Sequence, residues 1–486
     1  MPLLFIGYRF YLLLILFLFV LPVTLPPFDG HDSQRIAQIA IGMLCVILLL
    51  VKRSQVVLVN RSDQAVGMLI FGFGFCSIIT SVQPLWSLVE LAVLLICCAV
   101  ASAFALERRA HNDLFDKAMI IFVVLLCLMK CTGFLVSTAA AFSSGAPTLD
   151  TDLLLDAFSN KRFYGQFQTF TLPLLTIPLL LNGMKRSRRA WVLGLLACWW
   201  MIAICGGTRG TWLGMVVAGV ALASCGRQGR RILALQVFAL AGGISLFWLL
   251  FRVLPEYLGI TVANFAGDRI NASLSGREII WHQAWDMIQQ RPLLGVGPMH
   301  FANTYNPIAA HPHQSILQWG SEWGIPSIVL VGWLVFRGLR ATFLVIRRKE
   351  FTSAPIDLIR ICLFASLIGA LTQSMVDGVI VMPYSQLWLA IVVGWLLGIH
   401  EQVNKPVRLA HVVDKAWLAM LMAAAVLLGY VVSRDVPHLE ENQDQFAHDF
   451  GGKFQPRFWM QGVIAKPDAH LLELPKTASF FTQMPK

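Results

Sequence analysis

Residues 85–106 decide the class of fold, because they read LWSLVELAVLLICCAVASAFAL and contain a single charged side chain, Glu90. A helix that spans a bilayer needs about 20 predominantly apolar residues, and this stretch is long enough. The basic pair Arg108-Arg109 follows it almost directly. We therefore expect a membrane-spanning helix whose C-terminal end lies on the side of the membrane that retains positive charge.

The rest of the chain repeats this pattern of apolar stretch and polar break. Of the 486 residues, 57% are hydrophobic and only 13% are charged, whereas a soluble domain has roughly 25% charged residues. The spans are predicted at 3–22, 36–51, 65–82, 85–106, 118–142, 167–181, 191–205, 212–225, 232–254, 316–336, 358–376, 385–399 and 416–432. The predicted fold is an all-α polytopic membrane protein with about 12 or 13 transmembrane helices.

Positive charge alternates along the predicted loops and sets an orientation. Basic clusters lie at 52–61, 108–117, 185–189, 227–231, 337–349 and 405–408, in every second loop. The positive-inside rule then makes these loops and the N-terminus cytoplasmic. Most of the formal net charge of +11 is explained in this way, so no binding to nucleic acid is expected.

This orientation divides the chain into four parts. They are N-terminal transmembrane helices (1–254), an outer loop with an amphipathic helix (255–315), C-terminal transmembrane helices (316–433) and an outer tail (434–486). No nucleotide-binding glycine motif lies on the cytoplasmic side. The 10 cysteines lie in or beside apolar runs without zinc-type spacing, so we expect neither a metal nor a cofactor. Chemistry is expected at the outer face, where donors are carried by lipids.

The outer loop contains a predicted helix with an arginine in its first turn. Residues 275–278 form an S-x-x-E capping box, which includes Arg277. From Arg277, Trp281 and Ile288 recur at helical spacing until Pro292 ends the helix. The simplest role for this segment is an amphipathic helix on the membrane surface. That role leaves Arg277 available to bind a substrate.

Two histidines lie near the end of the same loop. His313 is predicted at the start of a helix that enters the membrane through Glu322, and His311 precedes it. A neutral imidazole at the boundary between water and lipid can act as a general base. For a lone histidine, a structural role is the more common alternative. Glu322 is interpreted either as a packing partner or as a proton acceptor, because ionisable groups inside membranes are costly.

Two further outer loops carry candidate phosphate ligands. In the glycine-rich turn 206–212, Arg209 and Gly210 combine one guanidinium group with exposed backbone N–H groups, which suits a phosphate; lipid headgroups are the alternative ligand. Lys161 and Arg162 lie in a third outer loop. The D-x-D sequence at 150–152 can bind a divalent metal, but a solvated acidic turn is the expected role.

The order and spacing of these residues resemble one family. His313-Gln314, nine further residues and Gly324 are similar to the H-[NSQ]-x9-G-x-x-[GTY] motif of O-antigen ligases and O-antigen polymerases. Residues 209–213 resemble the R-x-x-x-L motif of the ligases, and 292–297 resemble the P-L-L-G-x-G turn of the superfamily. The sequence departs from the pattern at Ser327, and the resemblance covers roughly 160–400.

The resemblance implies an integral membrane glycosyltransferase of the C type (GT-C-like) in the bacterial inner membrane. Such enzymes take a glycan from undecaprenyl diphosphate at the periplasmic face. They pass it to lipid A–core (ligases), to a lipid-linked glycan (polymerases) or to a serine or threonine of a pilin or other protein (O-oligosaccharyltransferases). The two matching motifs favour the ligase.

The resemblance to this family implies a role for each candidate residue. His313, Arg209 and Arg277 are the predicted catalytic residues, as a base and as two diphosphate ligands in a metal-independent, inverting reaction. The predicted substrate-binding residues are Gln314, Lys161, Arg162, Gly210, Trp281, His311 and Glu322. The rival class is a transporter for a lipid-linked glycan, which would require broken helices in two corresponding halves. No internal repeat of that kind is evident in the sequence.

Overall fold

The computed structural model describes residues 2–24, 30–52, 61–181, 183–263, 276–400, 411–451 and 453–465. These residues are almost entirely helical. The only strands among them, β1 (Thr148–Asp150) and β2 (Thr261–Ala263), are short and pair in parallel. The predicted all-α fold is confirmed.

Many of the helices follow one another with short connections, and longer segments precede α5, α11 and α12. Their bounds are α1 (Pro2–Thr24), α2 (His31–Lys52), α3 (Arg61–Ile79), α4 (Pro84–Ser143), α5 (Lys161–Leu175), α6 (Ile177–Leu180), α7 (Arg186–Gly206), α8 (Arg209–Ser224), α9 (Gly226–Trp248), α10 (Leu254–Leu258), α11 (Arg277–Gln290), α12 (Ser315–Trp323), α13 (Ile325–Arg348), α14 (Pro355–Gln373), α15 (Pro383–Ile399), α16 (His411–Asp435) and α17 (Leu439–Phe450).

Eight of the described helices are long and apolar enough to cross a membrane. One of them, α4, has 60 residues and a break at Asn112 (φ 40°, ψ −117°), so it covers two of the predicted spans. Three shorter apolar helices accompany the eight, over Tyr11–Thr24, Arg209–Ser224 and Pro383–Ile399. The chain is a multi-pass membrane protein.

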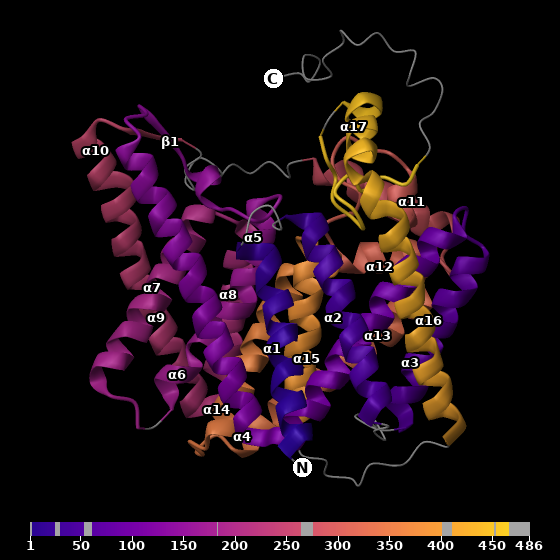
Figure 1. Ribbon diagram of the computed structural model, residues 1–486, viewed down its shortest axis with the longest axis horizontal. Coiled ribbons are helices and arrows are strands. Elements are labelled where there is room, and N and C mark those ends of the chain that lie inside the picture. The colour runs from indigo at the N-terminus through magenta and orange to yellow at the C-terminus, as the bar shows by residue number, and fades with distance from the viewer. Residues whose placement is uncertain are drawn as a thin grey trace.

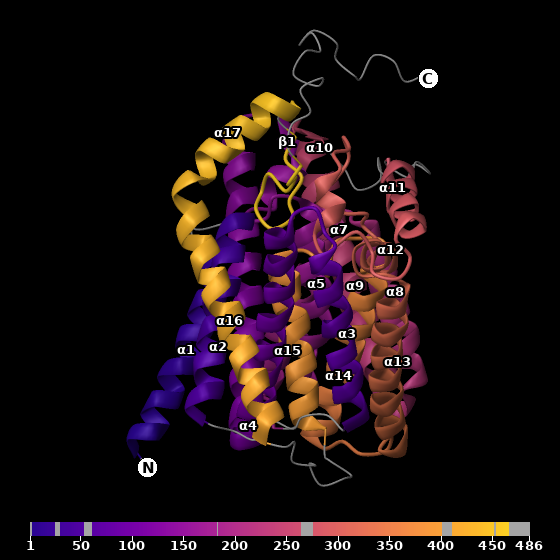
Figure 2. The same cartoon turned by 90° about the vertical axis from the view of Figure 1, so that its right-hand side faces the viewer.

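The helices stand side by side in one bundle with distinct ends (Figure 1). The start of α1 lies at the end that we call the lower end. Helices α10, α11 and α17 lie at the opposite, upper end in both views (Figures 1 and 2). The outer loop and the tail therefore share one end of the bundle, as the charge pattern predicts.

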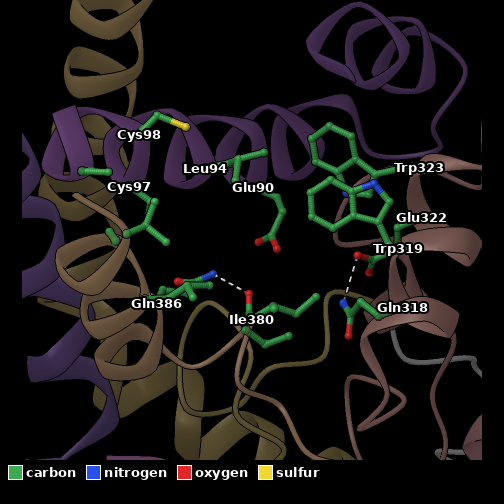
Figure 3. Close-up of a pocket in the computed structure, with 15 residues that line it drawn as sticks. Glu90, Leu94, Cys97, Cys98, Gln318, Trp319, Glu322, Trp323, Ile380 and Gln386 are labelled. Carbon is green, nitrogen blue, oxygen red and sulfur yellow. Dashed lines mark hydrogen bonds between the residues drawn. The ribbon is translucent and has the colours of Figure 1, made fainter. Parts of the chain in front are cut away.

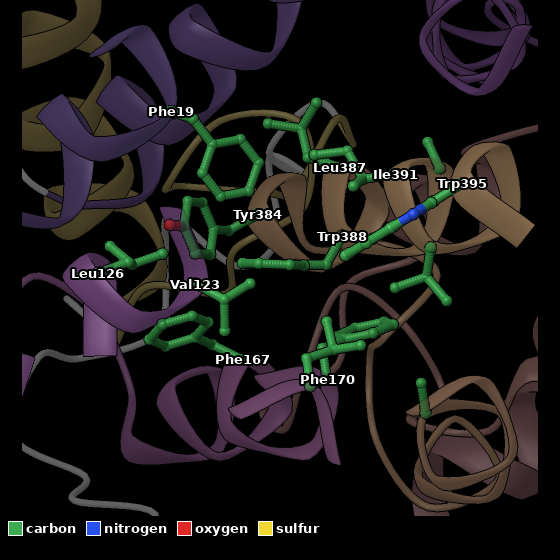
Figure 4. Packing of buried hydrophobic residues seen from close by; sticks show 14 of the residues in the cluster. Phe19, Val123, Leu126, Phe167, Phe170, Tyr384, Leu387, Trp388, Ile391 and Trp395 are labelled. Carbon is green, nitrogen blue, oxygen red and sulfur yellow. The ribbon is translucent and has the colours of Figure 1, made fainter. Parts of the chain in front are cut away.

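Aromatic side chains fill the centre of the bundle between α1, α4, α5 and α15 (Figure 4). Trp388 of α15 is fully buried and lies 5.2 Å from Phe19 and 5.9 Å from Phe167 between ring centroids. Helices in a membrane associate through close packing rather than through the hydrophobic effect. These interlocked rings fix α5, and with it the position of the residues at its upper end.

Candidate active site

Three of the helices that have arginine in their first turn, α5, α8 and α11, bring these guanidinium groups near one another. Arg162 is the second residue of α5, and Arg209 and Arg277 are the first residues of α8 and α11. Burial lowers the pKa of Arg277, and the positive charges of Arg162 and Arg209 lower it further. A helix N-terminus itself carries partial positive charge, so the cluster concentrates positive potential and favours a bound anion.

Arg277 retains an unused donor in this cluster. Its Nε is buried and has no hydrogen-bond partner among the described residues. Buried donors are normally satisfied. An acceptor on a ligand would satisfy this one, and a phosphate oxygen matches the geometry of a guanidinium group. Ser275, the predicted cap of this helix, lies outside the described residues; the observed N-cap is Gly276, which has φ 77°.

His313 lies directly before α12 and adopts an unusual backbone conformation. Its φ is 53°, in the left-handed region, and its side chain is buried. The helix begins at Ser315, two residues later than predicted, because Gln314 caps it by accepting from Leu317 N at 2.5 Å. The ring of His311 meets the ring of His313 edge to face at 4.1 Å between centroids.

Asp377 is a functional candidate that the sequence did not reveal. It lies between α14 and α15, and its Oδ1 is 3.8 Å from His313 Nδ1 and accepts from Gly378 N at 2.8 Å. His313 Nδ1 has no hydrogen-bond partner among the described residues. Asp377 is distant from His313 in the chain and has no motif around it. The only feature of the sequence that could have identified Asp377 is that it is a single acidic residue directly after the apolar run 358–376.

The electrostatic surroundings hold the imidazole neutral. Burial, together with the charges of Arg162 and Arg277, lowers the pKa of His313 to about 3. Burial raises the pKa of Asp377, while Gln166, the Gly378 N–H and Arg162 act in the opposite direction. His313 is therefore in its base form in the ligand-free protein. An anion that neutralises the two arginines would raise its affinity for a proton.

This coupling predicts two different titrations for the same ring. In the ligand-free protein, His313 should remain neutral from about pH 5 to 8, since its folded pKa lies below that window. Adding inorganic pyrophosphate should move the midpoint upward. The measurement is NMR of ¹³C-histidine-labelled protein in nanodiscs, with His313→Gln to assign the signal. A ligand-free midpoint near 6.5 would contradict the prediction.

Several predicted substrate-binding residues have structural partners. Trp281 Nε1 donates to Pro312 O at 3.0 Å and so ties α11 to the histidine loop. Lys161 Nζ pairs with Asp152 Oδ1 at 2.5 Å. Gly210 faces α14, because a Cβ there would lie 3.2 Å from Gln373 Cγ. Together with the cap formed by Gln314, these contacts position the site, and any contact of these residues with a substrate remains a prediction.

The predicted span 316–336 is divided into two helices at Gly324. This residue has φ 81°, and a Cβ there would lie 2.2 Å from Leu293 O, so the backbone of the 292–297 turn occupies the space. Ile325 N donates to Pro292 O, and Val296 N donates to Ser321 O, both at 2.8 Å. The two glycine motifs of the sequence therefore form one interlocked unit.

The side chain at the departure from the motif is accommodated. Ser327 is fully buried, and its Oγ accepts from Trp319 Nε1 at 2.7 Å. The hydroxyl group thus links α13 to α12. The serine at this motif position therefore leaves the packing of α13 against α12 intact.

Glu322 is a structural residue in this arrangement. Its two carboxylate oxygens accept from Arg457 Nη2 at 3.0 and 2.8 Å, and they also accept from Phe301 N and Gln318 Nε2. These four bonds favour the packing alternative over a proton acceptor. Arg457 lies in the predicted tail, which sequence reasoning left without a role.

One comparison with known proteins gives a match. Residues 191–332 match the protein family described as O-antigen ligase. This range runs from α7 into α13 and contains Arg209, Arg277 and His313. No curated protein matches the chain.

The helices make the chain a multi-pass membrane protein, and the matched region is similar to O-antigen ligases. The family match supports the superfamily of O-antigen ligases and O-antigen polymerases, and the resemblance inferred from the sequence is confirmed. Enzymes of this kind act on lipid-linked glycans.

Proposed function

We propose that the protein transfers a glycan from undecaprenyl diphosphate to an acceptor hydroxyl at the periplasmic face of the bacterial inner membrane. One observation carries this proposal. A neutral histidine, His313, lies beside a buried carboxylate, Asp377, and within electrostatic reach of an arginine cluster at three helix N-termini. A base next to an anion site is what this transfer requires.

The arginines bind and stabilise the leaving group. Arg209 and Arg277, with Arg162 beside them, bind the diphosphate of the donor. As the bond between the anomeric carbon and the phosphate oxygen breaks, its electron pair remains on the diphosphate, and the guanidinium groups stabilise the growing negative charge. Two or three fixed cations can supply this stabilisation without a metal.

His313 serves the nucleophile. Its Nε2 accepts the proton of the acceptor hydroxyl while the oxygen forms the new glycosidic bond on the opposite face of the anomeric carbon. Attack from that face inverts the configuration. Asp377 faces Nδ1, favours the tautomer with Nε2 unprotonated, and stabilises the imidazolium that forms. Because the donor neutralises the arginines, it raises the basicity of His313 only when the site is loaded.

For the acceptor, we propose lipid A–core, as in the ligases. The R-x-x-x-L sequence at 209–213 and the histidine motif support this choice. Transfer to a pilin or another protein, and polymerisation of glycan, are the alternatives within the same chemistry. Deletion of the gene tests them: loss of glycan from lipopolysaccharide supports the ligase, loss from a protein supports an O-oligosaccharyltransferase, and altered chain length alone supports a polymerase.

Metal independence is a separate expectation. Asp150 Oδ1 accepts from Asp152 N, and Asp152 pairs with Lys161. We therefore expect transfer by purified protein to keep at least half of its rate in EDTA. The variants Asp150→Asn and Asp152→Asn should retain activity within a few-fold. Loss of activity on chelation with recovery on adding Mg²⁺, together with inactive variants, would contradict the expectation.

A further inference from the structure

The segment that follows α17 returns to the bundle and crosses the histidine loop. We call residues 453–465 the C-terminal strap, and residues 299–314 the histidine loop. Ile464 N donates to Ala302 O at 3.0 Å, and Gln455 Nε2 donates to Asn306 O at 2.7 Å. Met460 N donates to Asp32 Oδ1 on α2 at 2.7 Å. The strap thus joins the loop to a transmembrane helix.

Arg457 is the deepest residue of the strap. It is 1% exposed, and its Nη2 contacts Glu90 Oε1 of α4 at 3.2 Å in addition to both oxygens of Glu322. Arg35 of α2 donates to Arg457 O at 2.9 Å and to Phe458 O at 3.1 Å. Side chains from α2, α4 and α12 therefore all bond to Arg457 of the strap.

The two carboxylates that hold Arg457 border a largely apolar cavity of about 230 Å³ between α4, α12 and α15 (Figure 3). Glu322 lies at one side of it and Glu90 nearer its middle, and Gln318 donates to Glu322 Oε2 at 3.0 Å. In such surroundings, an unpaired charge is costly to bury. Arg457 therefore has a fixed position, because it compensates both carboxylates.

A short chain of contacts leads from Arg457 to His313. Glu322 Oε1 accepts from Phe301 N of the histidine loop at 3.1 Å. Gly462 of the strap lies against Ala310, since a Cβ at Gly462 would be 3.2 Å from Ala310 Cβ. His313 N contacts His311 Nδ1 at 3.3 Å. The strap touches the loop at its start, middle and end, where the loop reaches the two histidines.

We propose that Arg457 is a positioning residue, and that the C-terminal strap holds the histidine loop so that His313 stays beside Asp377. This inference rests on the proposed function. An ion pair buried at this depth contributes little net stability compared with apolar packing. Its effect is instead to fix the geometry of the loop, and a displacement of about 1 Å in such a site can cost about 10²-fold in rate.

The test compares Arg457→Lys with a matched control, Arg108→Lys. Arg108 is also buried and pairs with Asp116 Oδ2 at 2.9 Å, in the segment of α4 at the lower end of the bundle. Both variants keep the charge and lose the guanidinium fork. The measurements are the melting temperature, kcat, the KM for undecaprenyl-diphosphate-linked glycan with lipid A–core as acceptor, and hydrogen exchange of 299–314.

Arg457→Lys should lower kcat by about 10- to 100-fold with the donor KM within twofold, and should speed exchange in the histidine loop. Arg108→Lys should lower the melting temperature without either effect. Unchanged kcat in Arg457→Lys, or an equal loss of kcat in Arg108→Lys, would overturn the inference. If Arg457→Lys does not fold, Gln455→Ala decides the question, because it removes one strap–loop hydrogen bond without burying a charge: a kcat at least threefold lower is expected, and an unchanged kcat overturns the inference.

These outcomes separate the inference from the proposed function. If His313→Gln is inactive while Arg457→Lys and Gln455→Ala keep their kcat, only the role of the strap fails. If His313→Gln itself keeps full activity, the proposed function fails, and the inference fails with it.

Discussion

His313→Gln is expected to lower the turnover of glycan transfer by about 10²–10⁴-fold, the usual contribution of a positioned general base. Glutamine retains polarity at a buried position but cannot accept and carry the proton. The donor should still bind, because the arginine cluster is unchanged. The measurement is steady-state transfer by protein in nanodiscs, with donor affinity measured separately by titration.

A histidine on the surface provides the control for this variant. His282 is an exposed residue of α11, and its Nδ1 lies 2.7 Å from Glu278 O within the same helix. His282→Gln should keep turnover within twofold. Full activity of His313→Gln would show that His313 is not the general base, whatever the activity of His282→Gln.

Arg277→Gln is expected to lower kcat/KM for the donor by at least about 10²-fold, because it removes both a ligand of the diphosphate and a charge that stabilises the leaving group. Arg277→Lys should recover part of this loss, since an ammonium keeps the charge without the bidentate fork. The same removal of charge should raise the ligand-free pKa of His313, because Arg277 helps to lower it. Rates and titration therefore test one residue in two independent ways.

The control for Arg277 lies on the same segment. Arg291 follows the last residue of α11 and lies about 20 Å from Arg277 along the helix axis. Its Nη1 donates to Thr80 O at 2.6 Å. Arg291→Gln should change kcat/KM by less than about threefold. An equal loss in both variants would mean that the response follows net charge and not a specific site.

The fold was largely predictable because its signal is local. Apolar runs of membrane length and alternating basic loops each depend on neighbouring residues, so they predicted the all-α bundle and the shared end of the outer loop and tail. The break at Gly324 was not predictable, because it depends on the backbone of Leu293 occupying the space of a Cβ. That contact joins segments that are separate in the sequence, so a hydropathy pattern cannot predict it.

The candidate site divides in the same way. Arg209, Arg277 and His313 were identified through motif spacing, and the structure brings these elements together at one end. Asp377 and Arg457 were missed because each is a single residue whose partners are distant in sequence. The structure gives Gln314, Gly210 and Glu322 structural contacts, namely a helix cap, a close helix contact and a buried ion pair. Their contact with a substrate stays a prediction.

The most direct test of the central claim uses purified protein in nanodiscs with undecaprenyl-diphosphate-linked glycan, lipid A–core and EDTA. We expect a new glycosidic bond with inverted anomeric configuration, release of undecaprenyl diphosphate in equal amount, and loss of both in His313→Gln. Movement of donor across the membrane without a new bond, or product formed equally by His313→Gln, would contradict it.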